Sequence, residues 1–359
     1  MKIMHVNNTL NIGGIEKFLL NVSKNIDLKK YEFVFLTYND FKYDLEDEFT
    51  KLGCRIYRID NPNKVSKIKH IKQIYNVIKK EKIDVIHTHT YFNSIYVMIA
   101  SILAKVNTRI VHSHTAFALN DNSISKRIAR KMLNVFATEK IACSKDAGYA
   151  LFGKNSNFQI ISNGIDFNKF YFNEQIRNKI RKQYNINDNE LLIGHVGRFD
   201  TPKNHKFLIK IFSEIIKQNK NYKLMLVGSG PLENNIKEIS KEFADKIIFL
   251  GNREDVNDII NAFDIIVFPS VFEGIPLTLI EAQVNGIPII ASTNVSTDVK
   301  LTDRVEFYSL NNNPKLWANK VIKYNKQRVD TKQKMLKSDY SINKVVKKLE
   351  KIYGDNHEK

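Results

Sequence analysis

The sequence predicts an α/β protein made of two doubly wound, parallel-sheet domains that follow one another along the chain. Three observations predict this class. Short β-branched or aromatic runs alternate with longer amphipathic segments, as in βαβ units. The pattern breaks after residue 166 and starts again at residue 191. The chain has 359 residues, which is long enough for two domains of ordinary size.

The first series alternates strands with helices. Strands are expected at 3–7, 32–38, 55–60, 84–89, 109–115, 140–144 and 159–162. Helices are expected at 16–26, 44–52, 66–80 and 94–105. Because parallel strands are joined by helical crossovers, this series predicts a parallel sheet that helices cover on both faces.

The second series follows a polar, basic stretch, residues 167–190, that is expected to be a linker. Strands are expected at 191–196, 223–227, 247–250, 265–269 and 288–292, and helices at 205–217, 232–243, 256–262 and 278–284. The tail from residue 315 is expected to be helical and to pack back across the domain junction. The expected domains are therefore 1–166 and 191–330, with C-terminal helices at 331–359.

Composition narrows the class of protein. With 43% hydrophobic residues the chain can bury a core, and its formal charge of +18 predicts attraction to an anionic partner. Charge alone leaves nucleic acid, a phosphorylated ligand and an acidic membrane open, beside a merely solvated lysine surface. The two separate cysteines exclude a disulfide framework, and the start lacks the apolar core of a signal peptide. We expect a cytoplasmic protein.

Residues with chemical potential follow several of the expected strands, where open α/β sheets bind ligands. After the first strand, Gly13 and Gly14 allow close approach of a phosphate or sugar, or simply form a tight turn. Two other strands end in His87-Thr88-His89 and His112-Ser113-His114. Alternating histidines share a face, so they suit a metal, a ligand contact or a structural role. Since no carboxylate or thiolate stands at ligand spacing, we expect no metal site.

The second series begins with a cationic loop. Gly197 and Arg198 end its first strand and Lys203 precedes the next helix. A planar guanidinium and an ammonium at fixed positions suit a diphosphate.

A pair of carboxylates stands later in the second series. Glu273 follows a strand and Glu281 lies eight positions further, inside a helix. Residues 274–277 between them are expected to form a helix N-terminus that is open to phosphate. Two carboxylates at these positions suit the hydroxyls of two sugar rings, or else a cap and a solvated helix residue.

The Glu273–Glu281 pair resembles the E-x7-E motif of retaining glycosyltransferases of family 4, which adopt the GT-B fold. Gly13-Gly14-Ile15-Glu16, His112-Ser113-His114, Asn163-Gly164-Ile165-Asp166 and Gly197-Arg198 to Lys203-Asn204 occur in the family's order. The similarity covers nearly the whole chain, and the local sequence is most similar to bacterial enzymes of exopolysaccharide and capsule assembly. It implies two Rossmann-like domains that face a central cleft.

The resemblance implies a role for each matched residue. Arg198 and Lys203 would neutralise the diphosphate of a UDP-sugar beside Gly197, Glu273 would bind the donor sugar, and Glu281 the ribose. Backbone groups of Gly274, Ile275, Pro276 and Leu277 would bind the phosphates, and Gly13 and Gly14 would close against the donor. His114 would lie near the donor hexose, with His112 as a possible substitute. The uracil would lie near Asn252 and Arg253.

The resemblance also implies the reaction and its partners. It is metal-independent transfer of a hexosyl or N-acetylhexosaminyl group, with no cofactor, from a UDP-sugar to a saccharide acceptor, with retention. The first domain would bind the acceptor, expected to be linked to a lipid diphosphate. The basic helix 66–80 and the cluster Lys126, Arg127, Arg130 and Lys131 would suit the inner membrane surface. Nucleic acid is not expected.

Other functions remain open for a chain with these motifs. A nucleotide-sugar epimerase and a phosphorylase share the architecture, and an inactive relative within an assembly complex would share the motifs. The intact Arg198, Lys203, Glu273 and Glu281 favour the transferase.

Overall fold

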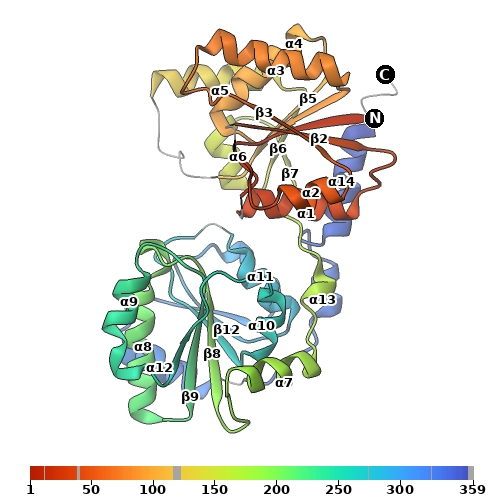
Figure 1. Ribbon diagram of the computed structural model, residues 1–359. Coiled ribbons are helices and arrows are strands. Elements are labelled where there is room, and N and C mark those ends of the chain that lie inside the picture. The colour runs from red at the N-terminus through yellow and green to blue at the C-terminus, as the bar shows by residue number, and fades with distance from the viewer. Residues whose placement is uncertain (12, 39–40, 116–122, 274, 325, 355–359) are drawn as a thin grey trace. The chain divides into compact units, whose positions relative to one another are not determined.

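A computed structural model describes residues 1–354 of the chain except 12, 39–40, 116–122, 274 and 325 (Figure 1). Contacts divide the chain into two compact units. Unit 1 comprises Met1–Ile165 and Asp339–Lys359, and unit 2 comprises Asp166–Ser338. Each is described by itself below.

Unit 1 is built on a seven-stranded sheet with the order β3-β2-β1-β4-β5-β6-β7, in which every pairing is parallel. The strands are β1 (Lys2–Val6), β2 (Glu32–Tyr38), β3 (Arg55–Ile59), β4 (Val85–Thr88), β5 (Thr108–Ser113), β6 (Glu139–Ala142) and β7 (Gln159–Ile160). Residues of β1, β2, β4 and β5 are buried almost throughout, as expected of a parallel sheet covered on both sides.

Helices cover both faces of this sheet. They are α1 (Gly14–Asn25), α2 (Glu46–Lys51), α3 (Lys67–Glu81), α4 (Ser94–Leu103), α5 (Ile124–Phe136), α6 (Lys145–Phe152) and α14 (Ile342–Gly354), with the 3-10 turn η1 (Tyr91–Asn93). Helices α1 and α14 share one hydrophobic core, and α3 and α4 share the other. Local signals fix their ends: the Ser66 and Ser144 side chains accept hydrogen bonds from the backbone N–H groups of Lys69 and Ala147.

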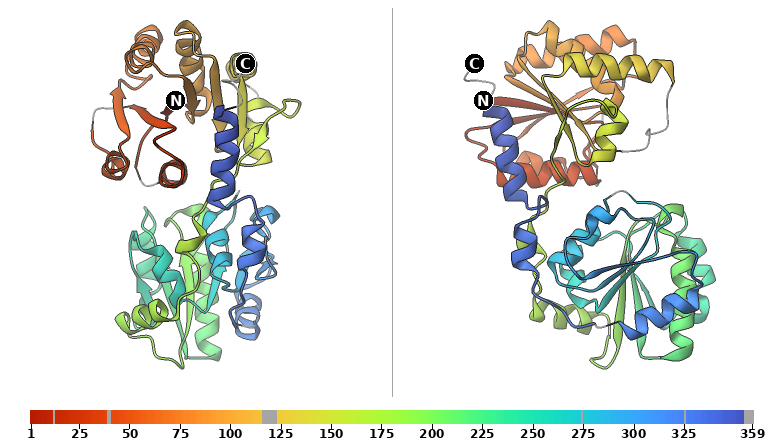
Figure 2. Two further views of the ribbon diagram at one scale, coloured as in Figure 1. Left: turned by 90° about the vertical axis from the view of Figure 1, so that its right-hand side faces the viewer. Right: turned by 180° about the vertical axis from the view of Figure 1, so that it is seen from behind.

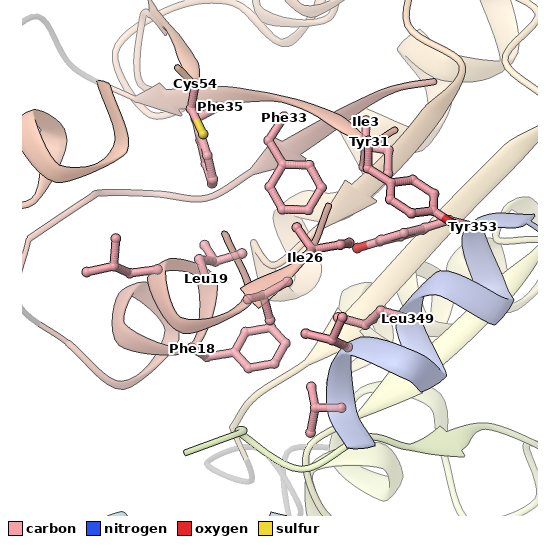
Figure 3. Close-up of a cluster of buried hydrophobic side chains, with 14 of the residues drawn as sticks. Ile3, Phe18, Leu19, Ile26, Tyr31, Phe33, Phe35, Cys54, Leu349 and Tyr353 are labelled. Atoms are coloured by element: carbon pink, nitrogen blue, oxygen red, sulfur yellow. The ribbon is translucent and has the colours of Figure 1, made fainter. Parts of the chain in front are cut away.

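The C-terminal helix α14 completes the core of unit 1. Leu349 and Tyr353 pack beside Ile26 and Tyr31 (Figure 3), and the helix lies next to α1 in both views of Figure 2. A Cβ at Gly164 would come within 2.8 Å of the Ile342 side chain, so this glycine allows the helix to approach. Helices α1 and α14 thus belong to one core although 316 residues of sequence lie between Asn25 and Ile342.

Unit 2 carries a six-stranded parallel sheet with the order β10-β9-β8-β11-β12-β13. The strands are β8 (Leu191–Val196), β9 (Tyr222–Val227), β10 (Ile247–Phe249), β11 (Ile265–Phe268), β12 (Ile289–Ser292) and β13 (Val305–Tyr308). The helices are α7 (Glu174–Gln183), α8 (His205–Gln218), α9 (Glu233–Ile239), α10 (Val256–Ala262), α11 (Leu277–Val284), α12 (Pro314–Lys323) and α13 (Lys332–Leu336). The short 3-10 turns are η2 (Phe167–Lys169), η3 (Thr201–Lys203), η4 (Lys241–Phe243) and η5 (Thr297–Val299). Helices α8 and α12 pack together on one face of the sheet, with the buried Trp317 in that core.

Two doubly wound parallel sheets confirm the expected fold class, and the predicted strands all occur with small changes at their ends. Strand β13 and helices α5 and α6 were not predicted. The expected helix 232–243 is interrupted at Ser240, where α9 ends and η4 begins. The segment 167–190, expected to be a linker, contains η2 and α7, and α7 packs on α10 within unit 2. Of the expected C-terminal helices, only α14 belongs to unit 1.

Among the described residues, none of the helices combines the length and the apolar character needed to span a bilayer.

Candidate active site

Both sheets have the topology that creates a ligand crevice at a defined place. In each unit the first and fourth strands lie side by side while their crossovers run in opposite directions. Ligands bind beyond the carboxyl ends of the strands at such a switch point. In unit 2 this point lies between β8 and β11, and in unit 1 between β1 and β4. Most of the expected site residues lie in or next to the segments that follow β1, β8 and β11, whereas His114 follows β5 and Asn252 and Arg253 follow β10.

The loops after β8 and β11 are tied together by hydrogen bonds. The Val271 backbone N–H donates to the Pro202 carbonyl at 2.8 Å. The Asn204 side-chain amide donates to the Pro269 carbonyl at 3.1 Å. Residues 197–204 and 269–273 therefore form one continuous surface at the switch point, rather than two independent loops.

Lys203 lies at the centre of this surface. Its Nζ is 2.6 Å from Glu273 Oε1 and 4.8 Å from the centre of the Phe268 ring, and its side chain is only 17% exposed. A Cβ at Gly197 would come within 3.1 Å of Lys203 Cδ and Cε, so the glycine makes room for the lysine stem. The structure thus brings together Gly197, Lys203 and Glu273. The Arg198 side chain, at the same loop, is exposed.

Helix α11 begins at the same edge. Pro276 is its N-cap residue and Leu277 its first residue, so the N–H groups of its first turn have no acceptor within the helix. Such an end attracts an anion. Ile275 and Glu281 are both half-buried. The Glu273 carbonyl accepts a hydrogen bond from the Ser296 N–H at 3.3 Å, which anchors the segment before the helix. The expected contact Gly274 lies outside the described residues.

One element of this edge was missed in the sequence. The loop Gly228-Ser229-Gly230 after β9 packs directly on the backbone of residues 197–199. A Cβ at Gly228 would come within 2.2 Å of the Gly197 carbonyl oxygen, and one at Gly230 within 2.5 Å of the Phe199 carbonyl oxygen. The signal was present as two glycines immediately after a buried apolar run. These glycines support the loop that carries Arg198 and Lys203.

Two further histidines lie beneath the same loop and were also missed. His195 and His205 are buried with ring centres 4.7 Å apart. The His195 Nδ1–H donates to the Val267 carbonyl at 3.0 Å. Burial, with the neighbouring His205 next, lowers the pKa of His195 well below its ordinary value. Burial, with Lys203 next, lowers the pKa of His205 to about 4. Both imidazoles are therefore neutral and leave the positive charge at this edge to the lysine and arginine.

The two residues expected near the uracil lie after β10. Asn252 and Arg253 are exposed, and Arg253 forms a bidentate ion pair with Asp255, with N···O distances of 2.8 and 2.7 Å. The Asn252 side chain is therefore available to contact a base, whereas the Arg253 guanidinium is already paired with the Asp255 carboxylate.

The Gly13–Gly14 loop of unit 1 follows β1 at the other switch point. Gly13 is the N-cap residue of α1, and a Cβ there would come within 2.4 Å of Glu16 Oε2. The Glu16 carboxylate accepts hydrogen bonds from Asn7 Nδ2 at 3.0 Å and Thr9 Oγ1 at 2.9 Å. A side chain at Gly13 would therefore displace the Glu16 carboxylate from these hydrogen bonds. A Cβ at Gly14 would meet no described atom within 4 Å, so Gly14 faces open space.

His114, just after β5, has both ring nitrogens engaged. His114 Nε2 is 2.9 Å from His89 Nδ1, and His114 Nδ1 is 3.1 Å from Asn163 Oδ1. His112 lies deeper and is fully buried. The segment Asn163-Gly164-Ile165-Asp166 thereby gains a physical explanation: Asn163 binds His114, Gly164 admits α14, and the Asp166 carboxylate caps η2.

The structure also brings the histidine pairs of neighbouring strands together, which the spacing within one strand does not reveal. The potential ligand atoms of His89, His112 and His114 lie within 4.8 Å of one another, and so do those of His5, His87 and His89. The expectation of no metal site stays a prediction.

Two Rossmann-like units, with a lysine, a carboxylate and a helix N-terminus converging at one switch point, define the class of GT-B glycosyltransferases. The solved structure of Anabaena HepE with UDP and glucose matches over 99% of this chain and 100% of its own, with a TM-score of 0.79 at 18% identity, which supports the fold. Residues 12–169 match the family model "Glycosyltransferase Family 4", and residues 176–341 match "Glycosyl transferases group 1". The chain belongs to glycosyltransferase family 4.

Three curated relatives extend this finding. The chain is 31% identical to the putative glycosyltransferase EpsF of Bacillus subtilis, over 83% of this chain and 80% of that protein. It is 25% identical to the capsular polysaccharide biosynthesis glycosyltransferase CapH of Staphylococcus aureus, over 98% of both. It is 29% identical to the UDP-Gal:alpha-D-GlcNAc-diphosphoundecaprenol alpha-1,3-galactosyltransferase of Escherichia coli, over 65% of this chain and 63% of that protein.

Proposed function

We propose that this protein is a retaining, metal-independent glycosyltransferase of cell-surface polysaccharide synthesis. It transfers a hexosyl or N-acetylhexosaminyl group from a UDP-sugar to a saccharide linked to a lipid diphosphate. The placement of Lys203 carries the proposal, because its ammonium group is held between two loops at the switch point beside a helix N-terminus. The E. coli relative, named for a UDP-sugar donor and a diphosphoundecaprenol-linked acceptor, supports the substrate classes.

In the proposed reaction, charge develops close to the charged groups of unit 2. The bond between the anomeric carbon and the phosphate oxygen breaks, so negative charge develops on UDP and positive charge on the sugar. Lys203, Arg198 and the first turn of α11 stabilise the departing diphosphate. Glu273 binds donor-sugar hydroxyls and Glu281 the ribose. The acceptor hydroxyl attacks from the side that the diphosphate leaves, and a phosphate oxygen takes its proton, so the configuration is retained. The roles of Gly13, Gly14, His114, Asn252 and Arg253 stay predictions.

The test is release of UDP from a panel of UDP-sugars, with and without added membrane lipid extract. Transfer of one sugar to the lipid fraction, unchanged by a chelator, is the expected result, since fixed cations at the diphosphate replace a metal. Activity that requires a divalent ion would contradict the metal-independent part. Epimerised donor without transfer would favour the epimerase alternative. If the protein neither binds UDP in calorimetry nor turns over any donor, the proposal that it is an enzyme is refuted.

Replacing the two carboxylates is expected to separate binding from turnover. Glu281→Ala should weaken UDP binding by about 10²-fold, because two ribose hydrogen bonds to a charged group are lost. Glu273→Ala should mainly lower kcat, by about 10²-fold, because the carboxylate contacts the donor sugar and also orients Lys203. Calorimetry with UDP and initial rates with the UDP-sugar measure the two effects. Equal and small effects of both substitutions would contradict the assignment.

Among the described residues of unit 1, the surface that best suits an anionic membrane lies on α5 rather than α3. Along α3, Ile74, Val77 and Ile78 are buried in the core, so its lysines are the solvated side of a packed helix. On α5, Ile124, Ile128 and Val135 form a stripe at helical spacing, and Ile124 and Val135 are 74% and 76% exposed. The exposed Arg127 and Lys131 lie among them. We propose that this stripe docks on anionic lipid, near the lipid-linked acceptor.

Substituting the stripe is expected to remove membrane binding without loss of catalysis in solution. Ile124→Glu combined with Ile128→Glu should lower co-sedimentation with vesicles of phosphatidylglycerol by at least about tenfold, because two apolar contacts become two repulsive charges. Lys67→Gln combined with Ile68→Glu, on exposed α3 positions, changes the net charge by the same two units and is the matched control. Equal loss for both pairs would show a general charge effect rather than docking through α5.

A further inference from the structure

Five histidines line one face of the unit 1 sheet. His5 lies on β1, His87 and His89 on and just after β4, and His112 and His114 on and just after β5. His5 pairs in register with His87, and residues two apart on a strand point to the same face. Except for His114, each is at most 3% exposed. The family's motifs include only the last two, so His5 and His89 need a separate explanation.

Three of these imidazoles form an uninterrupted chain of hydrogen bonds that ends at Asn163. His5 Nδ1 is 3.1 Å from His89 Nε2, and His89 Nδ1 is 2.9 Å from His114 Nε2. His114 Nδ1 is 3.1 Å from Asn163 Oδ1. These lengths are those of ordinary hydrogen bonds. Each imidazole therefore uses its Nδ1 toward the carboxyl edge of the sheet and its Nε2 in the opposite direction.

The Asn163 oxygen sets the direction of the whole chain. An amide oxygen only accepts, so the proton of His114 stands on Nδ1 and its Nε2 is a lone pair. That lone pair accepts from His89 Nδ1–H, and His89 Nε2 in turn accepts from His5 Nδ1–H. His5 Nε2, the last lone pair, has no hydrogen-bond partner among the described residues. This direction requires the Nδ1–H tautomer in all three rings.

The chain carries no net charge. Burial lowers the pKa of His5 to about 3 and of His114 to about 4, and lowers that of His89 well below its ordinary value. The 2.9 Å between His89 Nδ1 and His114 Nε2 fits a hydrogen bond between the rings. A chelated metal would instead need a lone pair on both atoms, and elemental analysis separates the two cases.

We propose that His5 and His89 are positioning residues that hold His114 as a neutral Nδ1–H imidazole, fixed in orientation, at the carboxyl edge of β5. This inference rests on the proposed function, in which that edge takes part in sugar transfer. Rotation of the His114 ring would break two hydrogen bonds at once, so the chain leaves it one orientation. His89 acts through His114 and not on the substrate, because its ring lies behind that residue with 3% exposure.

A spectroscopic test reads the tautomers directly. Two-bond ¹H–¹⁵N correlation spectra of histidine-labelled full-length protein at pH 7.5 are expected to show His5, His89 and His114 as neutral Nδ1–H forms. The assignment uses single His→Gln variants. Nε2–H forms, imidazolium forms, or stoichiometric metal found by elemental analysis of the purified protein would each overturn the proposal.

A kinetic test uses a conservative rescue. The Asn amide nitrogen occupies the place of histidine Nδ1, so His89→Asn retains the donor to His114 whereas His89→Leu removes it. We expect His89→Leu to lower kcat by about tenfold with little change in KM, the value of one hydrogen bond, and His89→Asn to stay within about threefold of wild type. His70→Leu, a buried histidine of α3 that bonds the Asp60 carbonyl and lies outside the histidine cluster, is the matched control and should resemble wild type. Equal losses in all three would indicate general disturbance of the core and overturn the positioning role.

Different results would refute the proposed function and the positioning role of His89. If the wild-type protein transfers no sugar, the proposed function fails, and the tautomer spectra still decide whether the chain exists. If transfer occurs and the tautomers are as expected, but His89→Leu retains full kcat, the chain is structural and the positioning role is wrong.

Discussion

Lys203→Ala is expected to lower kcat/KM for the UDP-sugar by about 10²- to 10³-fold, the usual effect of removing one preorganised group that stabilises developing negative charge. The lysine is well suited to this role because the protein fixes it before substrate binds. Its stem lies over Gly197, its Nζ faces the Phe268 ring, and Glu273 orients it. A flexible surface lysine would spend entropy on reaching the diphosphate, whereas Lys203 does not.

Initial-rate measurements at varied donor concentration check this prediction. Lys206→Ala, three residues further along and exposed, is the matched control and is expected to stay within about twofold of wild type. Thermal unfolding of both variants shows whether the fold is intact. Wild-type-like kcat/KM in Lys203→Ala would place the diphosphate elsewhere.

The second large effect is the acid sensitivity of unit 1. Its five clustered histidines all have a pKa lowered by burial, so the folded unit stays unprotonated while the unfolded chain takes up protons near pH 6.5. The stability that this difference contributes is complete above about pH 6.5 and is lost as the pH falls. Each such histidine lowers the free energy of unfolding by about 1.4 kcal/mol for each pH unit below about pH 6.5. Five histidines lower it by on the order of 7 kcal/mol for each pH unit, which is comparable to the stability of a whole domain.

Unit 1 is therefore expected to unfold on acidification between about pH 6 and 5, before unit 2, where His195 and His205 provide the corresponding effect. Trp317, the only tryptophan, is buried in unit 2 and reports on that unit by fluorescence. Hydrogen exchange of peptides from β1 and β4 reports on unit 1. His5→Phe should reduce the proton uptake on unfolding by about one. Urea stability of unit 1 that is equal at pH 7.5 and 5.5 would contradict this explanation.

Much of the fold followed from local pattern. Buried parallel strands are continuous apolar runs, so the strands of both sheet centres were recognisable. Strand β13 was missed because it is an edge strand in which Glu306, Phe307 and Tyr308 are only half-buried, so its sequence has no continuous apolar run. Helix α7 was missed because its sequence is strongly basic, although Asn173 provides a visible N-cap.

The candidate site, like the fold, was predictable from the sequence only in part. Residues of unit 2 were recognisable because their loops follow apolar strands and carry unusual glycines and charges. The histidine chain was not, because spacing within one strand gives only pairs. That β1 lies between β2 and β4, which brings His5 to His87 and His89, is a property of strand order. The Lys203–Glu273 ion pair likewise joins residues seventy positions apart.

The sequence order of the two units has a consequence for synthesis on the ribosome. Unit 2 is one uninterrupted stretch, whereas unit 1 lacks α14 until residues 342–354 have been translated, after the whole of unit 2. The nascent N-terminal domain therefore waits with the apolar side of α1 uncovered while the later domain can already fold. Unit 1, although it is translated before unit 2, is therefore the unit that would need a chaperone during synthesis. It is also the unit that would misfold if translation stopped before α14.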